Sequence, residues 1–107
     1  MGDGALEVTP AYAATLTVTN TADSGVGSLR QAILDADADD TITFNSVLSG
    51  GTINLASTLT LTKDITIDGS ALTNGIRING NGTHRVFEIS SGVTNSFIAL
   101  TITNGYE

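Results

Sequence analysis

The sequence predicts an all-β fold, a parallel β-helix of about three coils with one short capping α-helix near its N-terminus. Three observations lead to this prediction. Most of the chain consists of short segments in which apolar and polar residues alternate, with turn residues between them. These segments recur at a shift of about 24 positions, as expected of a solenoid. Only one segment, near residues 28–37, has a helical period instead.

Composition supports a single β-rich domain. The 107 residues include twelve Gly, one Pro and no Cys, and 40% of them are hydrophobic, which suits short strands joined by tight turns. The absence of cysteine excludes disulfides and thiolate metal sites. A formal net charge of −7 disfavours binding to nucleic acid and to anionic membranes. No apolar run approaches the length of a transmembrane helix, so we expect no membrane insertion in this segment.

Residues 1–14 differ in character from the rest of the chain. Ala11, Tyr12, Ala13 and Ala14 resemble the small-residue end of a secretory signal, whereas residues 1–10 are polar and acidic like a vector-derived leader. We predict that residues 1–14 are a tag or signal-peptide remnant, or a native disordered terminus. The capped β-helix domain then spans residues 15–107, as a fragment of a longer chain. A signal remnant would make the natural protein secreted or located at the cell surface.

The helix prediction near residues 28–37 depends on its cap and its apolar stripe. Ser28 and Gln31 have the spacing of a capping box, in which each side chain satisfies a backbone N–H of the other residue. An apolar stripe follows on one helix face, and a helix this short needs an apolar surface to cover. We therefore expect Leu29 and Ile33 to be buried against the first coil. The stripe consists of Leu29, Ala32, Ile33 and Ala36.

The strands are expected to stack with a shift of about 24 positions. Thr41 then aligns with Ile65, Thr52 with Ile76, and Ile76 with Leu100, while Val86 follows Ile65 after a shorter interval. An antiparallel sandwich also fits short alternating strands, but it does not predict this regular shift. The predicted strands are Thr15–Thr19, Thr41–Phe44, Thr52–Leu55, Leu59–Thr62, Ile65–Asp68, Ile76–Asn79, Val86–Ile89 and Ile98–Thr103.

Several runs of the sequence resemble a known module. They are Leu16–Asn20, Asp23–Gly25, Gly27–Ile33, Thr41–Phe44, Ile65–Gly69, Arg85–Glu88 and Leu100–Gly105. Together they are similar to the N-terminal β-helix module of bacterial surface proteins related to the polymorphic outer membrane proteins. The resemblance implies a right-handed helix, an exported location and a role as a stalk or adhesin scaffold. Family members commonly have an Asn, Pro and Gly loop after the helix, where this chain has Asp37–Asp40.

The expected function is therefore a non-catalytic structural or adhesive module of an exported surface protein, whose glycan or host ligand the sequence does not identify. The resemblance supplies no catalytic residues, so we predict that the chain is not an enzyme. The alternative is a fragment of a carbohydrate-active β-helix, a lyase or hydrolase. The repeat alignment would then bring Asp68 and Glu88 together as acid and base, or as a Ca²⁺ site.

Two further possibilities come from Asp and Thr patterns. Asp37, Asp39 and Asp40 are candidate ligands for weak Ca²⁺ binding, but the Gly and Glu of a calcium loop are missing. We otherwise expect no metal and no cofactor. Thr-x-Thr recurs at 17/19, 41/43, 60/62 and 101/103, the pattern of an ice-binding face. The alignment places Thr41 and Thr43 over residues 65 and 67, or over 66 and 68, and interrupts the ladder either way.

The last coil has no second capping helix after it in this sequence. Repeat arrays need a polar cap at each end, and an uncapped strand edge is a template for another chain. We therefore predict self-association through this coil, as a two-fold pair or an open stack, unless further coils of a longer chain cover it. The residues expected at this end are Val86, Phe87, Ile89, Ile98, Leu100 and Ile102.

Overall fold

A computed structural model describes residues 13–82 and 84–105. The predictions for residues 1–12 lie outside this part of the chain. The strands and helices are β2 (Thr15–Val18), α1 (Leu29–Asp35), β3 (Thr41–Phe44), the 3-10 helix η1 (Ser46–Leu48), β4 (Gly51–Asn54), β5 (Leu59–Leu61), β6 (Thr66–Asp68), β7 (Ile76–Asn79), β8 (Phe87–Ile89), β9 (Ser96–Ile98) and β10 (Leu100–Thr103).

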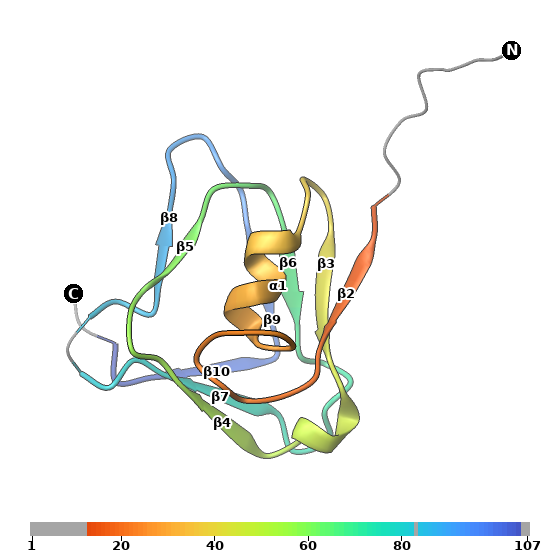
Figure 1. Ribbon diagram of the computed structural model, residues 1–107, viewed down its shortest axis with the longest axis vertical. Coiled ribbons are helices and arrows are strands. Elements are labelled where there is room, and N and C mark those ends of the chain that lie inside the picture. The colour runs from red at the N-terminus through yellow and green to blue at the C-terminus, as the bar shows by residue number, and fades with distance from the viewer. Residues whose placement is uncertain (1–12, 83, 106–107) are drawn as a thin grey trace, which may run out of the picture.

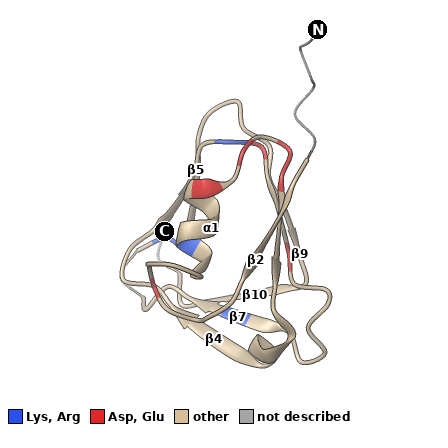
Figure 2. Cartoon of the chain, turned by 45° about the vertical axis from the view of Figure 1, so that its right-hand side comes forward, with Lys and Arg blue, Asp and Glu red and all other residues tan. Residues whose placement is uncertain are grey.

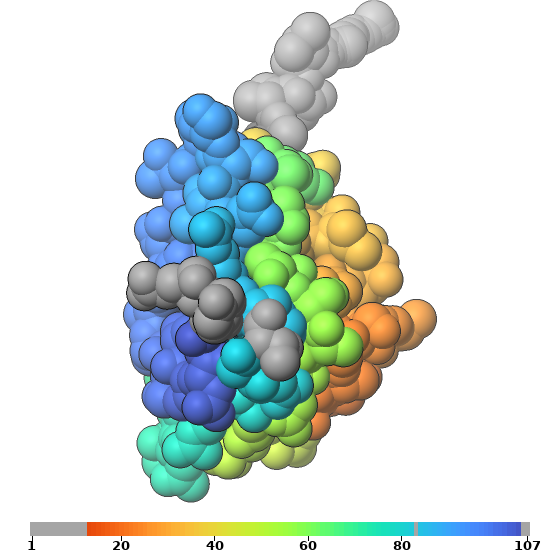
Figure 3. Space-filling view, turned by 90° about the vertical axis from the view of Figure 1, so that its left-hand side faces the viewer, coloured from red at the N-terminus to blue at the C-terminus, as the bar shows by residue number. Residues whose placement is uncertain are grey.

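The strands form three parallel sheets, β2-β3-β6-β9, β4-β7-β10 and β5-β8. The chain visits the sheets in turn, so each circuit adds one strand to each side of a triangle (Figure 1). Seen from the α1 side in Figure 1, it runs clockwise while receding from the viewer, which makes the coil right-handed. This is the predicted parallel β-helix of about three coils. Figure 3 shows the coils from the side as successive layers from orange to blue.

Inward-facing side chains of consecutive coils stack into columns. Ile42, Ile67 and Phe97 form one column, because β3 pairs with β6 and β6 with β9 in that register. Ile53, Ile78 and Ile102 form a second column in the sheet β4-β7-β10. The residues of the first two coils in these columns are buried, and the core that they build runs along the coil axis.

The coil-to-coil register differs in places from the predicted shift of about 24. The predicted alignment of Ile76 with Leu100 is confirmed. Thr41, however, pairs with Thr66 rather than Ile65, and Thr52 pairs with Arg77 rather than Ile76. The physical reason is that inward positions must match between coils, since a slip of one residue turns every core side chain toward solvent.

The third side of the triangle departs further from the prediction. Val86 does not align with Ile65, because β8 pairs with β5 and not with β6. The predicted strand 98–103 is also divided into β9 and β10, which belong to different sheets. Ala99 separates them with a φ of 56°, a left-handed conformation that turns the chain sharply from one sheet to the next.

An asparagine ladder links the three coils at one corner. The Asn79 amide nitrogen donates to Asn54 Oδ1 at 2.8 Å, and the Asn104 amide nitrogen donates to Asn79 Oδ1 at 3.0 Å. Each step of the ladder spans 25 residues. Side-chain amides that bond along the stacking direction in this way stabilise neighbouring strands in register.

The N-terminal end of the coil is closed by a cap. We use "cap" for α1 together with the loop at residues 19–28 that leads into it. Leu29, Ile33 and Ala36 are buried, and α1 contacts β2. In Figure 1 the helix lies in front of the triangle formed by the sheets. The predicted capping helix is therefore present, and it covers the core at the first coil.

Candidate functional site

The opposite end of the coil exposes the core layer of the last circuit. By register, each of its apolar residues continues an inward column of the preceding coil. We call this group the end face. It consists of Phe87 over Leu59, Ile89 over Leu61, Phe97 over Ile67, Leu100 over Ile76 and Ile102 over Ile78.

The end face exposes side chains of a kind that the previous coils bury. Ile89 is 45% exposed, Phe97 37% and Ile102 45%, whereas the residues below them are fully buried. Phe87 and Leu100 are half-buried and pack against the core. Phe87 and Phe97 come from different sheets, yet their rings stack with centroids 4.5 Å apart. The described residues thus leave a contiguous apolar layer without cover, which is typical of an interaction surface.

The same end presents strand edges. In β9, Ser96 N–H donates to Ile65 and the carbonyl of Ile98 accepts from Gly69, so both groups bond toward the preceding coil. Alternate residues of a parallel strand bond to opposite sides, and the backbone groups of Phe97 therefore point away from the coil. Unpaired N–H and C=O groups of this kind accept another strand.

Four of the five end-face residues, all but Phe97, are among those that the sequence placed at this end. Val86 was expected at this end, yet it is buried. Ile98 was expected among the exposed apolar residues of this end and is exposed, but it pairs with Asp68 and is not part of the inward layer. Phe97 takes the inward position instead, because Ala99 ends β9 before the next sheet begins. Phe97 and Ile98 are adjacent apolar residues, so the sequence pattern does not indicate which of the two faces inward.

At the capped end, only one of the two hydrogen bonds of the predicted capping box is formed. Ser28 is the N-cap, and its Oγ accepts from Gln31 N–H at 3.1 Å. The reciprocal bond of a capping box is not made: the Gln31 side chain donates to Asp35, and Ser28 N–H donates to Gly25. The reason is that the loop carbonyl of Gly25 already accepts both the Ser28 N–H and its hydroxyl.

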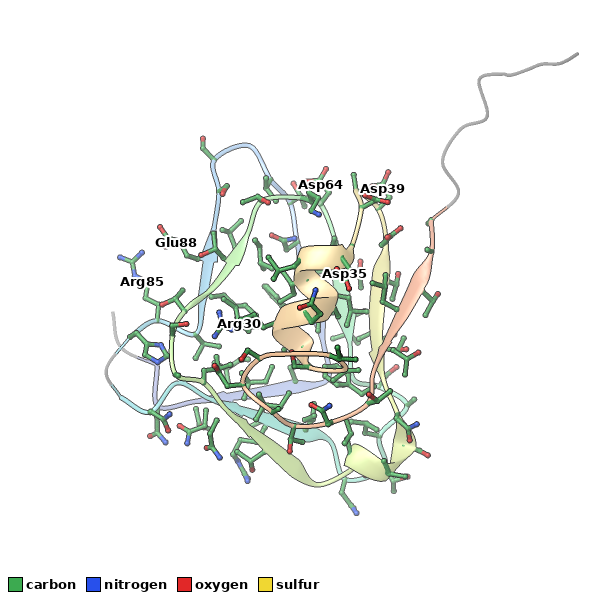
Figure 4. The ribbon with its side chains drawn as sticks, viewed as in Figure 1. Arg30, Asp35, Asp39, Asp64, Arg85 and Glu88 are labelled. Carbon is green, nitrogen blue, oxygen red and sulfur yellow. The ribbon has the colours of Figure 1, made fainter. Side chains whose placement is uncertain are left out.

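Arg30 ties the cap to the coil. Its guanidinium donates to the carbonyls of Ser57 and Thr58 at 2.8 and 2.9 Å, and Figure 4 shows it lying between α1 and β5. It also forms an ion pair with Asp23 in the cap loop at 3.1 Å. Arg30 was not among the predicted site residues, since a helical Arg gives no sign of a backbone partner far along the chain.

The acidic corner after α1 is a structural turn. Asp40 is 5% exposed, and its carboxylate accepts from the backbone N–H of Ala14 and of Asp37, each at 2.8 Å. These bonds, first that from Ala14, lower the pKa of Asp40. Asp39 adopts a φ of 72°, and its N–H bonds to the carbonyl of Asp64 in the next coil. The carboxylate of Asp40 therefore serves as an acceptor for backbone N–H groups of this turn.

A shallow cavity of about 270 Å³ lies beside this corner, lined by Asp39, Asp64, Ile65, Thr66, Thr94 and Ser96. Figure 4 shows Asp39 and Asp64 near one another there. The Asp64 carboxylate already accepts from Thr94 N–H at 2.8 Å. Among the described residues, no group of three or more carboxylate or imidazole side chains could hold a metal ion together.

The predicted proximity of Asp68 and Glu88 is wrong. Asp68 lies on β6 and pairs with Ile98, whereas Glu88 lies on β8 and pairs with Thr60. The error follows from aligning Val86 with Ile65. Asp68 instead accepts from Ser70 N–H at 2.8 Å, and the hydrogen bonds from Ser70 lower its pKa. The carboxylate pair on which the carbohydrate-active alternative depended is not assembled.

The threonine pattern follows the second of the two predicted alignments. Thr15, Thr41, Thr66 and Ser96 form one hydroxyl column across the sheet β2-β3-β6-β9. The second column begins with Thr17 over Thr43, whose hydroxyls are 3.4 Å apart. In the third strand of this sheet, β6, the second column continues with Asp68, and in the fourth strand, β9, it continues with Ile98. A two-column threonine array is therefore interrupted, as expected.

Comparison of the chain with protein-family models, curated proteins and solved structures finds no match. What the fold defines is a class: a right-handed parallel β-helix, capped at its N-terminal end. In the part of the chain that the structure describes, no helix has the length and hydrophobicity needed to cross a membrane.

Proposed function

We propose that this chain is a non-catalytic structural or adhesive module of an exported bacterial surface protein, and that it self-associates through its end face. The observation that carries the proposal is the exposed core layer of the last coil, with Ile89, Phe97 and Ile102 at 37–45% exposure. The location and the adhesive role are supported by the resemblance to surface-protein β-helix modules. A glycan or host-surface ligand would then bind elsewhere on the module.

Two properties of the end face favour association over a free surface. Burying exposed apolar area is worth roughly 25 cal/mol per Å². Strand edges such as that of Phe97 also gain hydrogen bonds when another strand pairs with them. An isolated strand could pair with such an edge but would leave much of the apolar layer uncovered. Another β-helix end could pair with the edges and cover the apolar layer at once.

Sedimentation over a range of concentrations tests the proposal. Ile102→Lys places a charge on the end face, and we expect it to abolish association. Val26→Lys is the matched control, because Val26 is 93% exposed in the cap loop at the other end. Loss of association in Ile102→Lys alone supports the proposal. A wild-type chain that stays monomeric at high concentration contradicts it.

A further inference from the structure

We infer that the partner of the end face is a second copy of the same surface, so that two chains pair tail to tail about a two-fold axis and stop there. This inference rests on the proposed function, since it specifies the geometry of the association. An open stack, in which the end face of one copy binds the first coil of the next, is the arrangement that it excludes.

The cap is the first reason. A head-to-tail contact needs an open core layer at the first coil, but Val18, Leu29 and Ile33 are buried there. The cap is also fastened by Arg30, which donates to the carbonyls of Ser57 and Thr58. The described coil leaves its core layer uncovered at one end only. A second uncovered core layer is therefore available only as the end face of another copy.

The cap does expose two large apolar side chains. Val26 is 93% exposed at the loop and Leu34 65% exposed on the outer side of α1. They do not belong to a core layer, and apolar residues that stand singly on a surface are common in monomeric proteins. β2 does present a strand edge at this end, because it is the outermost strand of its sheet and pairs only with β3. The core layer beside it, however, is covered by the cap, so this end lacks the open apolar layer of the end face.

Charge distribution is the second reason. The described acidic residues are concentrated at the cap and the corner that follows it, as Figure 2 shows. Five of them precede β3: Asp23, Asp35, Asp37, Asp39 and Asp40. Within residues 84–105, the charged residues are Arg85 and Glu88, one of each sign, and the five residues of the end face are uncharged. Tail-to-tail pairing places the two acidic caps of a chain with net charge −7 as far apart as possible.

Strand direction fits the same arrangement. A two-fold axis that superimposes the two end faces reverses the direction of the chain. The end strands of the two copies then meet antiparallel, a pairing that forms well-aligned hydrogen bonds.

The test is the limiting mass. We expect light scattering to reach twice the chain mass of 10.9 kDa and no more as the concentration rises. Ile102→Lys should return the mass to that of one chain, and Val26→Lys should leave the pair intact. Hydrogen exchange gives a second readout, because the amides of Ile89 and Phe97 should be protected in the pair and exposed in the Ile102→Lys monomer.

The outcomes separate the two proposals. Masses that increase without limit, with association still lost in Ile102→Lys, overturn the closed pair and leave self-association through the end face in place. A pair that dissociates in Val26→Lys means that the caps are in contact, and it overturns both. A monomeric wild type contradicts the proposed function itself.

Discussion

Arg30 and Asp23 join the helix of the cap to its loop and also to the segment of the coil between β4 and β5. The guanidinium donates to Asp23 Oδ1 at 3.1 Å, and that oxygen also accepts from Ala56 N–H at 2.8 Å. The hydrogen bond from Ala56 is the main cause of the lowered pKa of Asp23, with Arg30 contributing further. A single carboxylate therefore holds three segments together.

Replacing Arg30 tests this connection. Arg30→Ala removes its hydrogen bonds to Ser57 and Thr58 and leaves Asp23 without its cation. We expect a loss of about 1–3 kcal/mol in the free energy of unfolding, since hydrogen bonds to charged groups are worth about that much. Arg30→Lys should recover part of the loss, because Lys keeps the charge but not the planar fork. Denaturant melts of the two variants should differ; equal values would argue against the fork geometry.

The apolar face of the helix gives a second prediction. Ile33 is buried on the inner face of α1, whereas its neighbour Leu34 is 65% exposed. Ile33→Asp would bury an unpaired carboxylate and should cost several kcal/mol. Leu34→Asp introduces the same group on the same helix and should change stability by less than about 0.5 kcal/mol. Thermal melts of the pair measure the difference, and similar melting temperatures would mean that the helix does not cover the core.

The lowered pKa of Asp40 leads to a prediction of how the stability of the fold depends on pH. Its pKa is lowered in the folded chain by N–H donors from Ala14 and Asp37. Such a group stabilises the fold fully above the unfolded pKa of about 3.9, and that contribution is lost as the pH falls through the folded pKa. We expect the melting temperature to fall as the pH is lowered below about 4.

Asp40→Asn separates this group from the other carboxylates. The amide keeps one acceptor but turns a donor toward one of the two N–H groups, so the variant should be less stable than the wild type at neutral pH. Its melting temperature should also fall less between neutral and acid pH. Asp23 and Asp68 have lowered pKa values as well, so part of the acid sensitivity should persist. An unchanged pH profile would show that Asp40 is not involved.

The fold could be predicted because its signals are local and repeated. Ser28 before an apolar stripe indicates a helix start, and alternation indicates each strand whatever its partner. The register was harder, because it depends on the length of each corner. The asparagine corner keeps a spacing of 25 residues, but Phe87 pairs with Leu59 and Ser96 with Thr66, over longer corners. The error in the Asp68–Glu88 pair follows from aligning Val86 with Ile65 at a shorter interval, whereas the spacing over this part of the coil is longer.

The junction between β9 and β10 gives the last prediction. Ala99 holds a φ of 56°, a left-handed conformation that costs a non-glycine residue roughly 1–2 kcal/mol. Ala99→Gly removes this cost, at the expense of a more flexible unfolded chain, so we expect the variant to be as stable as the wild type or more stable. Ala99→Val, with a branched side chain, should destabilise the last coil. Ala56→Val is the control, since Ala56 is exposed and has no positive φ.

Chemical denaturation of Ala99→Gly, Ala99→Val and Ala56→Val measures these differences in stability. Sedimentation of the same variants measures the effect on self-association. Ala99 sets the angle between two strands of the end face, because β9 carries Phe97 and β10 carries Leu100 and Ile102. Ala99→Val should therefore weaken self-association as well as stability, whereas Ala99→Gly should preserve both. If Ala99→Val proved as stable and as associated as the wild type, β9 and β10 would not be joined through a left-handed residue, and the position of Phe97 on the end face would have to be reassigned.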